Sequence, residues 1–181
     1  MDIFAHAIWT NVLATIARKR QEKLRAMHQK FVSVAWATFW GIFPDLFAFT
    51  IPFGIGIFGW ITGAGFQYGR ETIATGLAPM LYNYSHSLVI WAVIFLGTWA
   101  VYKRPRWELL GWALHILIDI PSHANGFYLT PVFFPISGWK FTHGVSWGHP
   151  IYMIVNYSAM AIAWIGTMWY KRKINKELKN I

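Results

Sequence analysis

Three short polar motifs interrupt the apolar segments of this chain, and their side chains are of the kinds that bind divalent metal ions. His115 and Asp119 lie four residues apart in the apolar segment 107–123, so on a helix both side chains share one face, one turn from each other. Pro121 is expected to end that helix, which leaves His123 just beyond it. Two imidazoles and a carboxylate arranged in this way can supply two or three metal ligands. The alternative is a buried His–Asp pair that only fixes helix packing.

A second motif places a carboxylate inside an apolar segment. Asp45 directly follows Pro44 in the second half of segment 31–49, which is long enough to span about 30 Å of hydrocarbon. A carboxylate at membrane depth costs free energy and usually marks a functional site. Asp45 is therefore a candidate metal ligand and catalytic group. The alternative is a structural cap after a kink at Pro44.

The third motif is the Ser85, His86, Ser87 sequence that opens the apolar run 88–102. Ser85 is a good N-cap, so we expect His86 in the first turn of a helix. There the positive end of the helix dipole disfavours imidazolium and keeps the ring available as a ligand. The alternative is a capping polar cluster at the membrane interface.

A fourth candidate ligand lies near the start of the chain. His6 is at helical spacing from Asp2 and Trp9 in the mostly apolar segment 2–17. A secretion signal carries its cations before the apolar run, whereas here they follow it. We therefore expect a short first helix that stays in the protein.

The composition predicts an integral membrane protein. Of the 181 residues, 56% are hydrophobic, 19% aromatic and only 13% charged, whereas an ordinary soluble domain carries about 25% charged residues. The 12 tryptophans suit a membrane interface, where indole rings accumulate. The length fits a single membrane-embedded domain over residues 1–181. The absence of cysteine excludes disulfides and thiolate metal sites.

We expect an all-α fold, a bundle of about five helices with two Gly/Pro-rich loops on its outer side. The loops are residues 51–84, with a short helix near 72–82, and residues 124–150. The first loop has too many helix breakers for a continuous helix. His143 and His149 lie in the second loop, and each could turn towards a metal or remain an interfacial histidine. The expected helices are 2–17, 31–49, 88–102, 107–120 and 151–170.

The cations predict the orientation of this bundle. Fourteen of the 16 Lys and Arg fall within residues 18–30, 103–106 and 171–179. With these clusters in the cytoplasm, the expected helices alternate in direction without conflict. The three aspartates and six of the seven histidines then fall near the outer ends of their segments. We therefore expect a multi-pass cell-membrane protein with cytoplasmic basic loops and C-terminus and a site facing outside. Cations between apolar runs indicate an anionic membrane surface as partner, not nucleic acid.

Histidine and aspartate together suit Zn²⁺, with Mn²⁺ or Fe²⁺ as alternatives. Six or more candidate ligands exceed the four of one closed structural site, so they could hold two metals, or one metal beside a general base. A catalytic metal polarises a phosphoryl or acyl oxygen, and a site ringed by aromatic residues at the membrane surface would meet lipid or a lipid-linked substrate. Arg70 or Lys140 could pair with a phosphate. The alternative is that both are ordinary loop cations.

The motifs at His6, Pro44-Asp45, the Ser-His-Ser sequence around His86, and the HxxxD sequence followed by His123 resemble one known family. They look like the predicted membrane-bound metal-dependent hydrolases of bacteria and archaea, over residues 1 to about 150. That family is itself similar in motif order to zinc-dependent phospholipase C and the P1-type nucleases. The resemblance implies hydrolysis of a phosphoester by a metal site. Its ligands would be His6, Asp45, His86, His115 and Asp119, with His123 as a further candidate.

In the working hypothesis of phosphoester hydrolysis, we expect catalytic roles for two of these residues. His123 would act as an acid or base, and Asp45 would take part in the reaction as well as in binding. The chain departs from the family pattern at Phe47, where many members have a second acidic residue. It departs again at residues 81–84, where many members carry His-Arg.

Two rival classes of protein remain open at this point. One is a b-type haem protein, because histidines on facing transmembrane helices can ligate haem; Asp45 and Asp119 would be misplaced beside that cofactor. The other is a non-catalytic membrane protein whose His/Asp cluster is a structural polar network. Five short spans with no detectable repeat argue against a transporter.

Overall fold

The structure, a computed structural model, describes residues 1–24, 32–65, 76–123 and 128–179. Within these ranges every regular element is helical and there is no strand, which confirms the all-α prediction. The described ranges hold six α-helices and one 3₁₀ turn, Trp107–Leu109, where about five helices were expected. The α-helices are α1 (Ile3–Lys23), α2 (Val34–Ile61), α4 (Leu77–Ser85), α5 (Leu88–Tyr102), α6 (Leu110–Ser122) and α7 (Pro150–Lys179).

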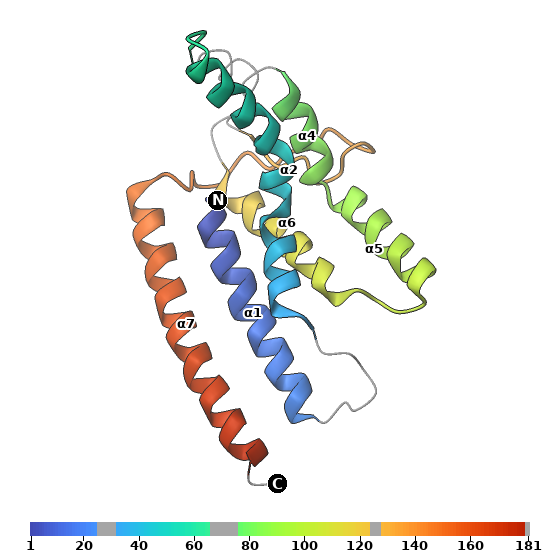
Figure 1. Cartoon of the computed structure of the whole chain (residues 1–181), viewed down its shortest axis with the longest axis vertical. Coiled ribbons are helices and arrows are strands. Elements are labelled where there is room, and N and C mark those ends of the chain that lie inside the picture. Colours follow the sequence, from blue (N-terminus) through green and yellow to red (C-terminus); the bar gives the residue numbers. More distant parts are fainter. Residues whose placement is uncertain (25–31, 66–75, 124–127, 180–181) are drawn as a thin grey trace.

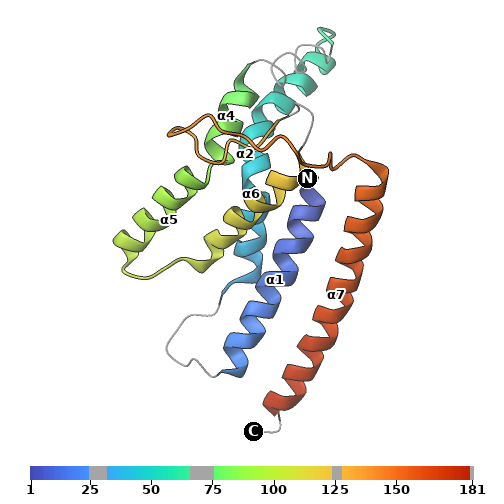
Figure 2. The same cartoon turned by 180° about the vertical axis from the view of Figure 1, so that it is seen from behind.

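Helix α2 lies at the centre of the molecule. It packs against α1, α4 and α6, and α7 lies along the outer side of α1 (Figures 1 and 2). Small residues let these backbones approach: a Cβ added at Gly41 would lie 2.2 Å from Thr10 Oγ1 of α1. A Cβ added at Gly111 of α6 would lie 2.2 Å from the carbonyl oxygen of Ala37. Close crossings of this kind are typical of helices packed inside a membrane.

The central helix runs further than the sequence indicated. A helix ending near residue 49 and a loop from residue 51 were expected, but α2 continues through Pro52 to Ile61, so the loop prediction is wrong for residues 51–61. In an apolar environment a backbone without helical hydrogen bonds has no other partners, and this cost outweighs the weak helix propensity of glycine and proline. The short helix also lies slightly later than expected, at Leu77–Ser85. Arg70 is outside the described residues.

Helices α1 and α7 extend into the basic segments that follow their apolar parts. Their ends are joined by an ion pair between Lys23 and Glu177, with Nζ and Oε2 3.0 Å apart, and by a hydrogen bond from Lys19 to Asn175. The two helices therefore run side by side in the same direction, with their basic ends together (Figure 1).

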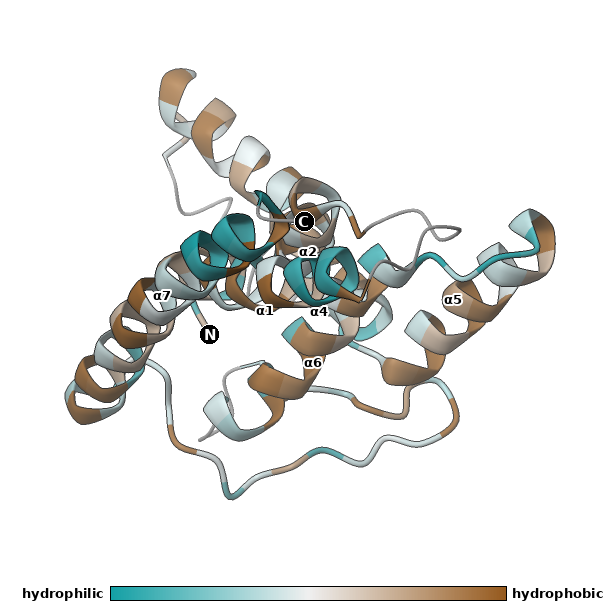
Figure 3. Cartoon of the chain, turned by 90° about the horizontal axis from the view of Figure 1, so that it is seen from below, coloured by the Kyte–Doolittle hydropathy of each residue, from teal (hydrophilic) through white to brown (hydrophobic). Residues whose placement is uncertain are grey.

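Two of the described helices, α2 and α7, are long and apolar enough to cross a membrane. The pair α4 and α5, bent by 56° at its junction, would make a third span if it acts as one. Large apolar side chains cover the outside of the molecule; Trp60, for example, is 72% exposed and Val101 74%. Brown, hydrophobic ribbon accordingly dominates α5 and α6 in Figure 3. These features indicate a membrane protein, and the number of passes and the orientation stay predictions.

Candidate metal centre

The start of α1, the end of α6 and the junction of α4 and α5 come together beside the middle of α2 (Figure 1). Polar side chains from these elements meet there. All but one of the six predicted ligands are buried, and Asp45 keeps 16% of its side chain exposed. The structure brings together every residue of the predicted set, namely His6, Asp45, His86, His115, Asp119 and His123.

Four of these residues, Asp45, His86, His115 and Asp119, direct one ligand atom each into a common space, within 4.8 Å of one another. The two imidazole Nε2 atoms are 3.1 Å apart. Asp119 Oδ2 lies 3.2 Å from His115 Nε2 and 3.4 Å from His86 Nε2. Asp45 Oδ1 lies 3.6 Å and 3.5 Å from the same two nitrogens. Four atoms about 2.0–2.2 Å from a tetrahedral ion are roughly 3.3–3.6 Å apart, so this set fits one metal ion.

Hydrogen bonds outside the cluster orient both imidazoles. His115 Nδ1 lies 2.7 Å from the carbonyl oxygen of Gly41, which can only accept, so Nδ1 carries the proton and Nε2 presents its lone pair to the cluster. His86 Nδ1 is 2.9 Å from Ser85 Oγ. The ring of Tyr82 stacks on His86 with centroids 3.6 Å apart. Contacts on the far side of each ring therefore fix the direction in which Nε2 of His115 and Nε2 of His86 point.

Asp119 uses its two oxygens differently. Oδ1 accepts from the amino group of Met1 and lies 3.0 Å from His6 Nε2 and 3.6 Å from His123 Nδ1. Oδ2 points into the four-residue cluster, beside the Nε2 atoms of His115 and His86. With the His115 proton on Nδ1, Nε2 of that ring cannot donate to Oδ2, and a bound cation would stabilise both lone pairs.

His6 and His123 lie beside the four-atom cluster, not in it. His6 stacks on His115 with ring centroids 3.6 Å apart. Burial lowers the pKa of His123 to about 4, so this ring is neutral at pH 7 and can accept a proton.

The prediction that Ser85 caps a helix at His86 is wrong. Ser87 is the N-cap of α5, accepting from the backbone N–H groups of Val89 and Ile90, and His86 lies at the end of α4. The helix-dipole argument for a neutral His86 therefore fails; neighbouring groups, not the helix terminus, orient its ring. Helix α6 also passes Pro121 and ends at Ser122, because a proline in the last turn forfeits only one hydrogen bond.

The second predicted loop contributes no ligand. His143 and His149 are exposed in the segment before α7, and so is Lys140. Sequence reasoning also missed two residues that shape the site, Gly41 and Tyr82. The four-residue spacing between Tyr82 and His86 could have indicated their stacking, whereas nothing in the sequence marks a backbone acceptor such as Gly41.

A cavity of about 680 Å³ opens beside the cluster. Asp45 and His123 line it on the cluster side, and apolar side chains of the second half of α2, such as Phe49 and Phe53, line one wall. The first residues of the chain and three aromatic residues complete the lining, namely Tyr82, Tyr128 and Trp147. A ligand in this cavity would place a polar end at the cluster and an apolar part along α2.

The geometry does not fit haem. A haem iron bound by two histidines has the porphyrin plane between them. The Nε2 atoms of His86 and His115 are 3.1 Å apart, which leaves no room for that plane.

Comparisons with known proteins give no relative for this chain. No family model matches it, and neither the curated proteins nor the solved structures contain a match. Its function must therefore be argued from the site.

Proposed function

We propose that the protein is a membrane-bound metal-dependent hydrolase that cleaves a phosphoester in a lipid or lipid-linked substrate. One observation carries the proposal: two imidazole nitrogens and two carboxylate oxygens converge within 4.8 Å of one another, and the nitrogen–oxygen distances are close to those of a tetrahedral site. Two histidines and two carboxylates favour Zn²⁺, with Mn²⁺ or Fe²⁺ as alternatives. The motif order shared with the predicted membrane-bound hydrolases supports the same reading.

The residues around the cluster have the chemistry that hydrolysis needs. A bound divalent metal would lower the pKa of its water and polarise a phosphoryl oxygen. Asp45, the most exposed of the four ligands, borders the cavity and can orient a water molecule or accept its proton. His123 also borders the cavity with a neutral ring, so it can accept the proton that an attacking water molecule loses and pass it to the leaving oxygen.

The substrate class follows from the cavity and from the membrane character of the chain. Its walls are mostly apolar apart from the groups at the cluster, so a purely polar phosphoester would leave them exposed to water. A phosphoester on an apolar chain would place its phosphate at the cluster and its chain against the apolar walls.

Metal content is the first test, measured by elemental analysis on detergent-purified protein. We expect one or more zinc, manganese or iron ions per chain in the wild type and in His143→Ala, whose histidine is exposed and outside the cluster. His115→Ala and Asp119→Ala should lose the metal. Wild-type protein that holds no metal and takes none up on reconstitution would leave the structural polar network as the explanation.

Activity is the second test, on phospholipids and phosphodiesters with metal-loaded protein. His123→Gln should keep its metal, because His123 is outside the four-atom cluster, and should slow hydrolysis by about 10²–10⁴-fold, the usual contribution of an acid or base. Metal-loaded wild type that cleaves none of these substrates would count against the hydrolase but not against the metal site.

A further inference from the structure

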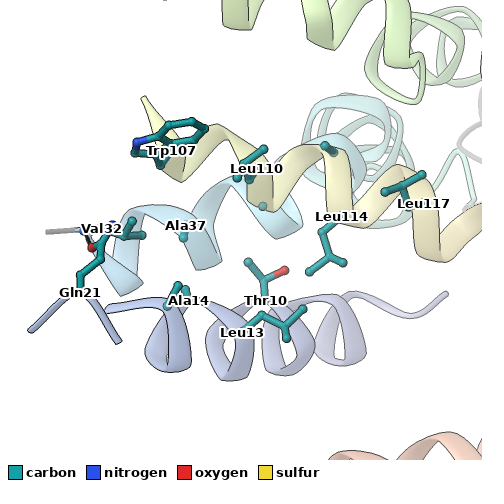
Figure 4. Close-up of a pocket in the computed structure, with 13 residues that line it drawn as sticks. Thr10, Leu13, Ala14, Gln21, Val32, Ala37, Trp107, Leu110, Leu114 and Leu117 are labelled. Atoms are coloured by element: carbon teal, nitrogen blue, oxygen red, sulfur yellow. Dashed lines mark hydrogen bonds between the residues drawn. The ribbon is translucent and has the colours of Figure 1, made fainter. Parts of the chain in front are cut away.

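A second cavity, of about 460 Å³, lies on the other side of the Gly41 crossing, away from the metal centre. It is a groove between α1 and α6 over the first turns of α2 (Figure 4). Its walls are aliphatic, with Leu13 and Ala17 from α1 and Leu110 and Leu117 from α6. Contact between such an apolar surface and water is unfavourable, so the groove suits a hydrocarbon occupant.

The groove has the length of one membrane leaflet. Its α1 wall runs from Thr10 to Gln21, which at 1.5 Å per residue is about 16 Å. This is about half of the roughly 30 Å hydrocarbon core of a bilayer. Leu117 lies at one end of the groove in Figure 4, and Gln21 and Trp107 lie at the other.

Two arginines of α1 flank the Gln21 end of the groove, and Arg18 is paired there with Glu22, with Nε and Oε1 3.0 Å apart. On α1, Arg18 is four residues after Ala14 and Arg20 three after Ala17, so both flank the wall of the groove. Lys19 points away instead and bonds Asn175 of α7. Seen from below, the hydrophilic ends of α1 and α7 face the viewer (Figure 3).

The other wall of the groove contributes to the same end. Trp107 lines the groove and is 41% exposed. Arg104 and Arg106 come shortly before it in the chain, and the Arg106 guanidinium lies over the ring of Tyr102 at the end of α5. An indole at this position is typical of the boundary between hydrocarbon and headgroups. The charge at this end therefore suits a phosphate at the depth of lipid headgroups.

We propose that this groove binds one acyl chain of an anionic phospholipid, with the lipid phosphate beside Arg20 and Trp107. The chain fills the aliphatic walls over the depth of one leaflet, and the cations select an anionic headgroup. The lipid is a bound component of the helix assembly and is separate from the proposed substrate, so this inference does not depend on hydrolysis.

The test is native mass spectrometry of protein from micelles that contain equal amounts of phosphatidylglycerol and phosphatidylcholine with the same chains. Wild type should retain one lipid, mainly phosphatidylglycerol. Ala17→Phe should lose it, because the added ring fills the groove from an exposed position that leaves the core intact. Ala161→Phe, on the exposed surface of α7, is the matched control and should retain it.

A second pair of variants tests the headgroup. Arg20→Gln should reduce the preference for phosphatidylglycerol about fivefold, whereas Arg172→Gln on α7 should leave it unchanged. Equal lipid retention in Ala17→Phe and Ala161→Phe would overturn the proposal, as would equal retention of the two lipids by wild type. A wild-type dimer that Ala17→Phe dissociates would instead assign the groove to a second copy of the chain.

Discussion

At the scale of single residues, the site depends on groups that hold the two central imidazoles from behind. His115 is fixed by the carbonyl oxygen of Gly41, and His86 by Ser85 and by the ring of Tyr82. Partners of this kind set ring orientation and tautomer, and their loss typically weakens metal binding 10–100-fold. The affinity of the site should therefore respond to residues that touch no metal.

Tyr82 allows the ring and the hydroxyl to be tested separately. Its ring stacks on His86, and its hydroxyl donates to the carbonyl oxygen of Tyr128 at 2.8 Å. Tyr82→Phe should keep the metal and lower the free energy of unfolding by about 1 kcal/mol, the usual value of one hydrogen bond. Tyr82→Ala should lower metal affinity about 10–100-fold. Titration with Zn²⁺ and thermal unfolding measure the two effects; equal affinity in both variants would show that the stacked ring does not position His86.

The ligand types could be predicted from the sequence because histidine and aspartate are rare within apolar segments. Spacing also related His115 to Asp119, which share a helix face. The division of labour could not be predicted, since His6 and His123 contact one oxygen of Asp119 while the cluster uses the other. That outcome depends on distances between helices, which the sequence does not contain.

At the scale of helices, the crossing of α1, α2 and α6 sets the position of the site. Thr10 of α1 packs against Gly41, and Gly111 of α6 packs against the backbone at Ala37. The same Gly41 supplies the acceptor for His115. Helix packing and ligand orientation are therefore coupled through one residue.

Gly41→Ala tests this coupling. The added Cβ would lie 2.2 Å from Thr10 Oγ1 and 2.7 Å from Thr10 Cβ, so α1 and α2 must separate. We expect a loss of about 1–3 kcal/mol in stability, as for other overpacked cores, together with weaker metal binding. Gly97→Ala is the control: a Cβ at this position of α5 meets nothing within 4 Å, and alanine favours a helix by about 1 kcal/mol. Unchanged melting temperature and zinc affinity in Gly41→Ala would show that the crossing is not tight.

The positions of the helices could be predicted better than their ends. The apolar runs predicted the positions of five helices, namely α1, α2, α5, α6 and α7. The glycine and proline content led to the wrong prediction that α2 ends before Pro52. Propensity describes a helix in water, where a broken backbone finds other partners. Ser85 and Ser87 are equally good caps in isolation. The choice of Ser87 depends on α4, whose last residue is Ser85.

At the scale of the whole molecule, the candidate metal centre lies between two parts of the fold. α1, α5 and α7 extend from its level towards the basic clusters, whereas α4 and the second half of α2 extend the other way (Figure 2). Asp45 accordingly lies in the middle of its helix, not near the outer end as expected, because α2 continues to Ile61. The candidate centre thus lies beside the middle of α2, and the cavity along the second half of this helix would admit the amphipathic substrate that we propose.

The orientation of the chain gives the last prediction, and the lack of native cysteine makes it simple to test. Ser137 lies in the segment before α7, and Lys176 lies in the basic end of α7, so the apolar part of the helix separates them along the chain. Both residues are exposed. If the basic clusters are cytoplasmic, a membrane-impermeant maleimide should label Ser137→Cys on intact cells and Lys176→Cys only after the membrane is opened. The reverse pattern would place the basic ends outside the cell and the cavity beside the His/Asp cluster on the cytoplasmic side. Labelling of both positions from one side would mean that α7 does not cross the membrane, and the comparison of the lipid groove with one membrane leaflet would then lose its basis.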